Sequence, residues 1–165
     1  MPDPSLHVIL IGPMGVGKTT VGVALARRLG WPFLDSDEVI EALRGTTGRD
    51  VVTSEGIEGL HRIELAVLER MVATPPRAVI ASAESVVDSA LGRDLLASQL
   101  AVRLTAPPEV LTERRLSGQH RRVVTAEEAA ELARRRADDL VACTIASVDT
   151  SMSVGACVAR ISAIV

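Results

Sequence analysis

Residues 12–19 read Gly12-Pro13-Met14-Gly15-Val16-Gly17-Lys18-Thr19, which matches the pattern G-x-x-x-x-G-K-[ST]. An apolar run at residues 6–11 precedes this stretch, and a segment with helical periodicity follows it. A strand, a glycine-rich turn and a helix in this order are typical of a loop whose backbone N–H groups surround a polyphosphate. The stretch therefore predicts a nucleotide-binding site in an α/β fold.

The residues of this loop have separate expected roles. Lys18 would reach the terminal phosphates of ATP, and the hydroxyl group of Thr19 could bind Mg2+. The helix that starts here adds the positive end of its dipole. We expect the nucleotide to contact Gly12, Met14, Gly15, Val16, Gly17, Lys18, Thr19 and Thr20.

Length and composition narrow the function classes. The chain has 165 residues, enough for one domain with a substantial core, so we expect a single domain over residues 1–165. Hydrophobic residues make up 47% of the chain and aromatic residues only 1%, so the core must consist of Val, Leu, Ile and Ala. The net charge of -3 argues against nucleic acid as a partner, because such proteins gather Lys and Arg on one surface.

The sequence also gives expectations about compartment. Cys143 and Cys157 are isolated thiols without the spacing of a metal site, as expected for buried side chains in a reducing cytosol. No apolar stretch reaches about 18 residues, and Met-Pro-Asp-Pro at residues 1–4 lacks the basic start of a signal peptide. We therefore expect a cytoplasmic protein with no membrane partner.

Five apolar runs alternate with segments of helical periodicity. The runs suited to buried strands are residues 6–11, 32–35, 78–82, 100–105 and 144–149. This alternation predicts a parallel sheet with helices on both faces. Helices are indicated by the stripe Val21, Leu25 and Leu29 before Gly30, by the stripe Leu60, Ile63, Val67 and Met71, and by the capping box Thr125 to Glu128, which opens a helix through about residue 141.

Two basic segments follow in the second half of the chain. Residues 114–124 are polar, contain four arginines and lie between two expected helices. Arginines on a flap can fold over a triphosphate, so we expect a mobile lid here, with an ordinary solvated loop as the alternative. The run Arg134-Arg135-Arg136 lies on a helix, where we expect mostly solvated side chains and an i,i+4 pair between Glu131 and Arg135.

With these motifs in order, the chain resembles the shikimate kinase family of small P-loop kinases over nearly its whole length. The family pattern T-V-G-x-x-L-A-x-x-L-G occurs at residues 20–30, and F-x-D-x-D-x-x-I-E occurs complete at residues 33–41. A third family motif matches residues 56–64 in part. The resemblance implies a P-loop NTPase three-layer sandwich, a five-stranded parallel sheet of order 2-3-1-4-5, ATP and Mg2+ as cofactors and, usually, a monomer.

The resemblance gives roles to two aspartates at the end of the second expected strand. Asp35 would bind Mg2+ together with Thr19, and Asp37 would contact the acceptor hydroxyl as its base or orienting group. Both roles suit phosphoryl transfer, which depends on placing the attacking oxygen in line and neutralising phosphate charge. Helix N-capping is the alternative for both side chains.

Three arginines also receive roles from the resemblance. Arg136 falls where the family has an arginine that grips the carboxylate of the acceptor. Arg115 resembles the arginine that packs on adenine, and Arg122 resembles the lid arginine that reaches the phosphates. Together with Lys18 and Asp37, Arg122 would form the catalytic set.

The chain departs from the family on the acceptor side. The motif G-E-x-x-F-R-x-x-E has His61 in place of its arginine, and a histidine cannot form the planar fork of a guanidinium. Where the family has a glycine triplet, this chain has Ala83-Glu84-Ser85, so side chains fill space that bare backbone would leave. If Glu84 points inward, it would repel an acid and favour a neutral or cationic acceptor; if it points outward, it is a surface carboxylate.

These residues predict a small-molecule kinase that transfers the γ-phosphoryl group of MgATP to an alcohol held by Asp37, His61, Glu84 and Arg136. Shikimate is the nearest named acceptor, and a sugar acid such as gluconate, or a cyclitol, is the rival. A second hypothesis is a nucleotide-binding paralogue that has lost catalysis, because an intact loop beside an altered acceptor site suits that reading too. A nucleoside monophosphate kinase is less favoured, because the region between Asp37 and Pro75 is short.

Overall fold

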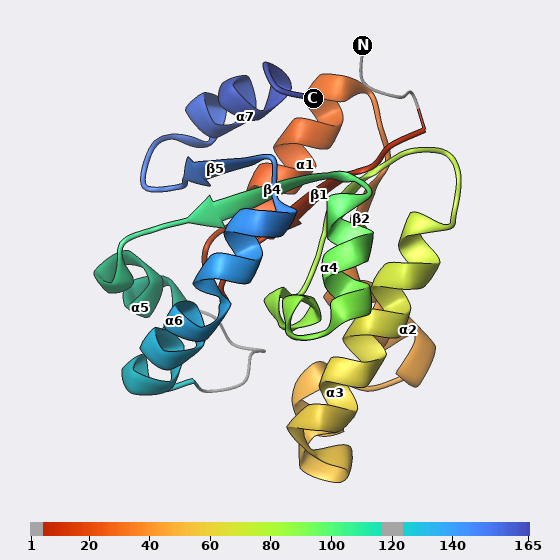
Figure 1. Cartoon of the computed structure of the whole chain (residues 1–165), viewed down its shortest axis with the longest axis vertical. Coiled ribbons are helices and arrows are strands. Elements are labelled where there is room, and N and C mark those ends of the chain that lie inside the picture. The colour runs from red at the N-terminus through yellow and green to blue at the C-terminus, as the bar shows by residue number, and fades with distance from the viewer. Residues whose placement is uncertain (1–4, 117–123) are drawn as a thin grey trace.

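Five parallel strands form the central sheet of the computed structural model, which describes residues 5–116 and 124–165 (Figure 1). The strands are β1 (Val8–Ile11), β2 (Phe33–Asp35), β3 (Val79–Ala81), β4 (Leu100–Thr105) and β5 (Ala146–Asp149). They are hydrogen-bonded in the order β2-β3-β1-β4-β5, so the predicted order and direction are confirmed. The predicted run 100–105 matches β4, and the other four runs extend slightly beyond their strands.

Helices cover both faces of this sheet. They are α1 (Lys18–Leu29), α2 (Ser36–Arg44), α3 (Gly48–Val72), α4 (Ala90–Ala97), α5 (Pro108–Leu116), α6 (Ala126–Cys143) and α7 (Val154–Ser162), with a 3-10 helix, η1 (Glu84–Asp88), after β3. The helices α1 and α7 pack together on one face, and α3, α4 and α6 lie on the other (Figure 1). The expected three-layer sandwich is therefore confirmed. Within the described residues, no helix is long and apolar enough to cross a bilayer.

The central strand β1 shows how the sequence divides the core into two layers. Val8 and Leu10 join the apolar cluster of α1 and α7, whereas Ile9 and Ile11 join that of α3, α4 and α6. All four side chains are fully buried. Because successive strand residues point to opposite faces and both faces are covered, such a strand needs a continuous apolar run.

The strand register brings three strand ends to one edge of the sheet. Strand β3 pairs with both β1 and β2, and Ala81 lies opposite Leu10 on one side and Asp35 on the other. The phosphate loop after β1, the start of α2 after β2 and η1 after β3 therefore leave from neighbouring points. In open parallel sheets, ligands bind outside this carboxyl edge.

The helix signals in the sequence are largely confirmed. Helix α1 ends at Gly30, and the capping box of Thr125 opens α6. Helix α3 begins well before its apolar stripe, at a second capping box formed by Thr47 and Asp50. A kink at Gly56, where φ is 77° and ψ is 173°, separates this first part from the part that carries residues 57–72.

Two expectations about the basic segments are wrong in part. Residues 114–116 form the last turn of α5, so the expected lid begins as a helix; its residues 117–123, including Arg122, lie outside the described residues. On α6, Arg134 rather than Arg135 pairs with Glu131. Helical neighbours at i,i+3 are as close as those at i,i+4, so the sequence pattern could not decide between them.

Candidate active site

The phosphate loop connects β1 to α1 and is packed tightly against β4. A Cβ atom at Gly12 would lie 2.4 Å from the carbonyl oxygen of Leu104, so a side chain there would displace the strand. Gly17 caps the start of α1 with a φ of 101°, which L residues rarely adopt. The loop therefore has the tight, side-chain-poor backbone that a polyphosphate cradle needs.

Lys18 begins α1 and folds its side chain back over the loop. Its Nζ atom donates hydrogen bonds to the carbonyl oxygens of Gly12, at 2.7 Å, and Pro13, at 3.3 Å. The ammonium group is therefore held above the loop backbone, in a position to neutralise phosphate charge.

Thr19 and Asp35 form a pair of oxygen ligands beside the loop. The Thr19 hydroxyl donates a hydrogen bond of 2.7 Å to Oδ2 of Asp35. The other carboxylate oxygen, Oδ1, accepts from the backbone N–H of Asp37 at 3.0 Å and caps α2. Asp35 thus acts as the helix cap that the alternative reading proposed, and still faces Thr19. Hydroxyl and carboxylate oxygens next to a phosphate site fit Mg2+, which keeps water and phosphate as its other ligands.

Glu64 of α3 is a buried acid within electrostatic range of Asp37, Arg136 and Lys18. It is 8% exposed, and the Ser85 hydroxyl donates a hydrogen bond to its carboxylate. Burial raises the pKa of Glu64 to about 7; Ser85 opposes this shift, the charge of Asp37 adds to it, and Arg136 and Lys18 counteract it. Because each of these charges acts on Glu64, residues from α1, α2, α3 and α6 converge on one region.

Arg136 of α6 is buried and held by two carboxylates. Its Nε and Nη2 atoms donate to the two oxygens of Asp88 at 2.8 and 2.6 Å, and Nη1 donates to Glu84 at 3.4 Å. Burial alone would lower the pKa of Arg136, but Asp88 and Glu84 together outweigh it, so its pKa is raised. The expectation that most of this run is solvated is confirmed, because Arg134 and Arg135 are exposed and Arg136 alone is buried. The side chain of Glu84 points inward, as one of the two alternatives had it. We call Glu84, Asp88 and Arg136 the carboxylate clasp.

Several site residues were missed by the sequence analysis. Asp88 had no signal, because its partner Arg136 lies 48 positions away. Ser85 and Glu64 were both inside quoted motifs, yet only the fold shows that they face each other. His61, half-buried on α3, lies one helical turn before Glu64.

Helix α5 supports the phosphate loop through two arginines. Arg114 donates to the carbonyl oxygen of Val16 at 3.1 Å and to the hydroxyl and carbonyl oxygens of Thr150 at 3.0 and 2.9 Å. Arg115 donates from Nε to the carbonyl oxygen of Met14 at 3.2 Å. Arg115 thus lies against the loop backbone. Arg114 links the loop to the end of β5, a role that the sequence did not indicate.

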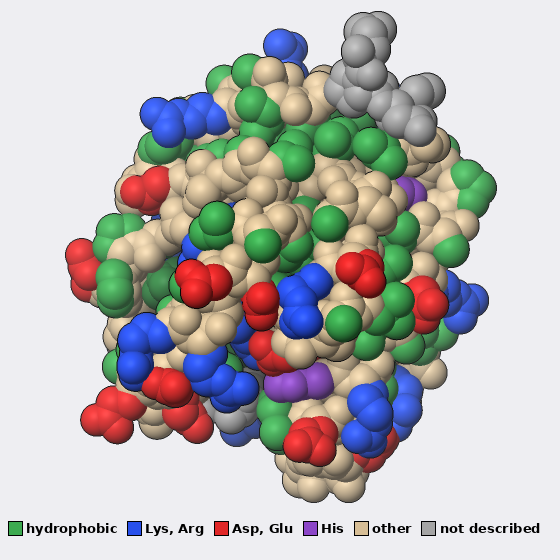
Figure 2. Space-filling model, viewed as in Figure 1, with side chains coloured by type: hydrophobic (Ala, Val, Ile, Leu, Met, Phe, Trp, Pro, Cys, Tyr) green, Lys and Arg blue, Asp and Glu red, His purple; other side chains and the backbone are tan. Residues whose placement is uncertain are grey.

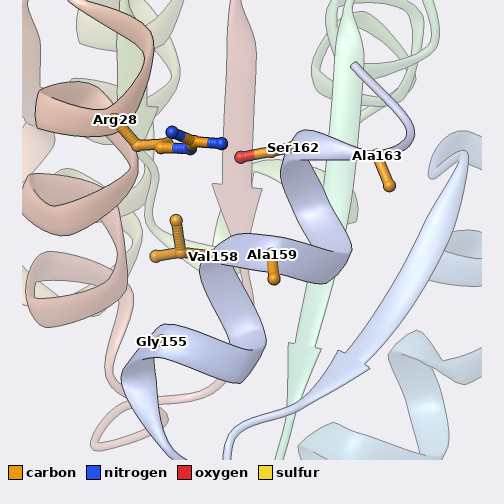
Figure 3. Close-up of a pocket in the computed structure, with 6 residues that line it drawn as sticks. All are labelled: Arg28, Gly155, Val158, Ala159, Ser162 and Ala163. Carbon is orange, nitrogen blue, oxygen red and sulfur yellow. The ribbon is translucent and has the colours of Figure 1, made fainter.

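The surface has two further features. Charged side chains gather in the lower half of the face shown in Figure 2, where Figure 1 places α3, α5 and α6, and hydrophobic and uncharged atoms cover much of the upper half. A hollow between α1 and α7 is lined by Arg28, Gly155, Val158, Ala159, Ser162 and Ala163 (Figure 3). None of these six belongs to the loop or to the clasp, so the hollow is separate from the candidate site.

Comparison with known proteins agrees with this geometry. The family model described as shikimate kinase matches residues 14–153. The chain belongs to the shikimate kinase family. The predicted family is thereby confirmed, and membership supports a phosphotransferase with an alcohol acceptor that uses ATP with Mg2+.

Individual members of the shikimate kinase family are similar along most of the chain. The shikimate kinase of Symbiobacterium thermophilum is 38% identical over 118 residues, which is 71% of this chain and 68% of that protein. The shikimate kinase of Moorella thermoacetica is 35% identical over 157 residues, covering 93% and 90%. The solved structure of shikimate kinase from Acinetobacter baumannii in complex with shikimate has a TM-score of 0.85 at 28% identity, covering 96% of this chain and 90% of that one.

Proposed function

We propose that this chain transfers the γ-phosphoryl group of MgATP to a hydroxyl group of a small acceptor, with shikimate as the nearest named acceptor. The observation that carries the proposal is the arrangement at one sheet edge: Lys18 over the loop, the Thr19–Asp35 pair beside it, and Asp37 at the start of α2. Nucleotide, metal and acceptor groups would thus meet outside the ends of three neighbouring strands.

The phosphate loop would hold ATP. Its proposed contacts are Gly12, Met14, Gly15, Val16, Gly17, Lys18, Thr19 and Thr20, followed by Arg115 from α5 and Arg122. Lys18 would stabilise the charge of the moving phosphoryl group, and the family resemblance gives Arg122, which lies outside the described residues, the same task. Thr19 and Asp35 would hold Mg2+, which supplies further neutralisation of phosphate charge.

Asp37 would orient the acceptor and take its proton. In the transfer, the acceptor oxygen forms a bond to the γ-phosphorus, the bond from that phosphorus to the bridging oxygen breaks, and ADP leaves. The hydroxyl proton passes to the Asp37 carboxylate, which is exposed and lies within range of the Glu64 charge. His61, Glu84 and Arg136 would line the acceptor end.

Assembly and compartment are finer parts of the proposal. A monomer would suffice, because the proposed groups come from one chain. The two thiols, Cys143 and Cys157, are free and buried, which supports a reducing compartment such as the cytoplasm. The net charge of -3 supports the expectation that nucleic acid is not a partner.

The test is acceptor-dependent ADP formation with MgATP and, in turn, shikimate, gluconate and a neutral cyclitol. We expect saturable ADP formation with at least one of them and a background near that of the nucleotide alone. Tight MgATP binding without stimulation by any of the three would instead favour a nucleotide-binding paralogue that has lost catalysis.

A further inference from the structure

Resting on the kinase function proposed above, we propose that the acceptor of this chain is a polyol without a carboxylate. The carboxylate clasp occupies Arg136 from inside the protein, and it turns that end of the site into one that accepts hydroxyl groups and rejects acids. Glu84 and Asp88 are then specificity-determining residues for the transfer.

The first argument is the occupancy of the guanidinium. A carboxylate binds arginine best through two parallel N–H···O bonds. Asp88 already makes such a pair with Nε and Nη2, and Glu84 takes a hydrogen bond from Nη1, so three of the five N–H groups of Arg136 have carboxylate partners. The two N–H groups that remain, one on Nη1 and one on Nη2, lie beside the oxygens of Glu84 and Asp88, so a carboxylate on the acceptor would either displace one of these groups or bind against their negative charge.

The second argument is burial. The side chains of Arg136 and Glu84 are 7% and 11% exposed, whereas that of Asp88 is 37% exposed. Asp88 could swing toward solvent, but an incoming carboxylate would then meet the buried charge of Glu84 at close range. Displacing Asp88 alone therefore does not open a site for an acid.

The third argument is the balance of charge. Among the described residues of the clasp, the single cation Arg136 already faces two carboxylates, Glu84 and Asp88, and Asp37 and Lys18 lie within range of the neighbouring Glu64. Lys18 would also serve the ATP phosphates, which add more negative charge. An anionic acceptor would be repelled, whereas a polyol would donate its hydroxyl protons to carboxylate oxygens, which are acceptors only.

The experiment compares shikimate with its methyl ester, which keeps the ring and its hydroxyl groups but has no charge. We measure kcat/KM from ADP formation at saturating MgATP, and the affinity of each compound for the ADP complex by calorimetry. We expect both kcat/KM and affinity to be about tenfold higher for the ester than for the acid. In the double variant Glu84→Gln, Asp88→Asn, affinity for the acid rises at least about tenfold, while affinity for the ester changes little.

The controls separate this proposal from the kinase function and from misfolding. Asp139→Asn neutralises a half-exposed acid of α6 that pairs with Arg93, and it should change neither compound's affinity. ADP affinity reports folding of each variant, and the single variant Glu84→Gln replaces the double one if the latter does not fold. The kinase function is tested separately with the neutral cyclitol, and if neither shikimate nor its ester supports ADP formation, their affinities measured by calorimetry still decide the specificity.

The result that would overturn the proposal is an acid used or bound at least as well as its ester by the wild type. If neither compound binds the wild type, gain of acid binding in the double variant supports the clasp. Failure of the folded variant to gain it contradicts the clasp.

Discussion

Glu64 is the residue at which the charges of the candidate site meet, and its environment differs from that of an ordinary surface acid. It is almost fully buried, it accepts a hydrogen bond from Ser85, and Asp37 lies close enough to disfavour its ionisation. A raised carboxyl pKa of this kind has a consequence for stability that can be measured.

Glu64 should make the protein less stable as the pH rises from 4.5 to about 7. The folded state holds a proton that the unfolded chain releases above its model value of 4.5, so the contribution is full below that pH and is lost through about 7. The total is on the order of 3 kcal/mol. Urea unfolding across this range should show the slope in the wild type, and Glu64→Gln should flatten it.

A second group, His7, also changes stability with pH, so the slope measured for Glu64 needs a correction and a control variant. Burial lowers the pKa of His7, and this histidine therefore favours the folded state above its model value of 6.5 and disfavours it as the pH falls, opposite in sign to Glu64. The quantity to compare is thus the difference between wild type and variant. Glu58→Gln, an exposed acid on the same helix, should leave the slope intact, and an equal slope in Glu64→Gln would refute the assignment.

At this scale the sequence predicted residues whose partners lie within a motif. The motifs singled out Lys18, Thr19 and Asp35, and the structure brings these three beside the loop, while their roles stay a prediction. Asp88 was not singled out, because its importance depends on a distant arginine. The burial of His7 was not predicted either, and its Nδ1 accepts a hydrogen bond from the backbone N–H of Ala78.

Among the elements, α5 has a supporting role that its sequence did not indicate. Arg114 holds both the loop and the end of β5 through three hydrogen bonds. Arg114→Met should destabilise the fold by about 2 kcal/mol, because charged hydrogen bonds to buried carbonyl groups are lost. It should also weaken MgATP binding about tenfold.

Calorimetry and chemical denaturation would measure these two effects. Arg135→Met removes an exposed arginine of α6 and should alter neither quantity. Nucleotide affinity unchanged in Arg114→Met would show that the loop keeps its shape without α5.

Helix α3 depends on a second backbone feature, the kink at Gly56. Its φ of 77° and ψ of 173° lie in a region that is almost restricted to glycine, so Gly56→Ala should cost about 2 kcal/mol. Since the kink orients the part of α3 that carries His61 and Glu64, acceptor turnover should fall while MgATP affinity persists. Thermal unfolding and steady-state kinetics would measure both effects.

Gly155→Ala is the matched control, because Gly155 lies in the first turn of α7 with open space around its Cβ position. It should be neutral or stabilising. A similar, small effect of both substitutions would mean that the kink is not required.

Element boundaries show where sequence patterns stop being informative. The capping box of Thr125 and Glu128 predicted the start of α6 correctly. The capping box of Thr47 gave no such signal, because its partner is Asp50 rather than Glu or Gln. The long α3 was seen only through its apolar stripe, since its first part is largely exposed.

On the scale of the whole molecule, the alternation of apolar runs and helical segments was sufficient for the parallel sheet and its two covering layers. The strand order came from the family resemblance rather than from the pattern of runs. The phosphate side was predictable because a strand, a loop and a helix specify it locally. The acceptor side was not, because it joins α2, α3, η1 and α6 across the carboxyl edge.

The most direct test of the account is transfer of the labelled γ-phosphoryl group from MgATP to an acceptor by the wild type and by Asp37→Asn. We predict transfer by the wild type, a loss of about a hundredfold to ten-thousandfold in kcat for the variant, and an ATP affinity that stays within about threefold. Equal transfer rates in the two proteins, or bound nucleotide with no labelled product from the wild type, would contradict it.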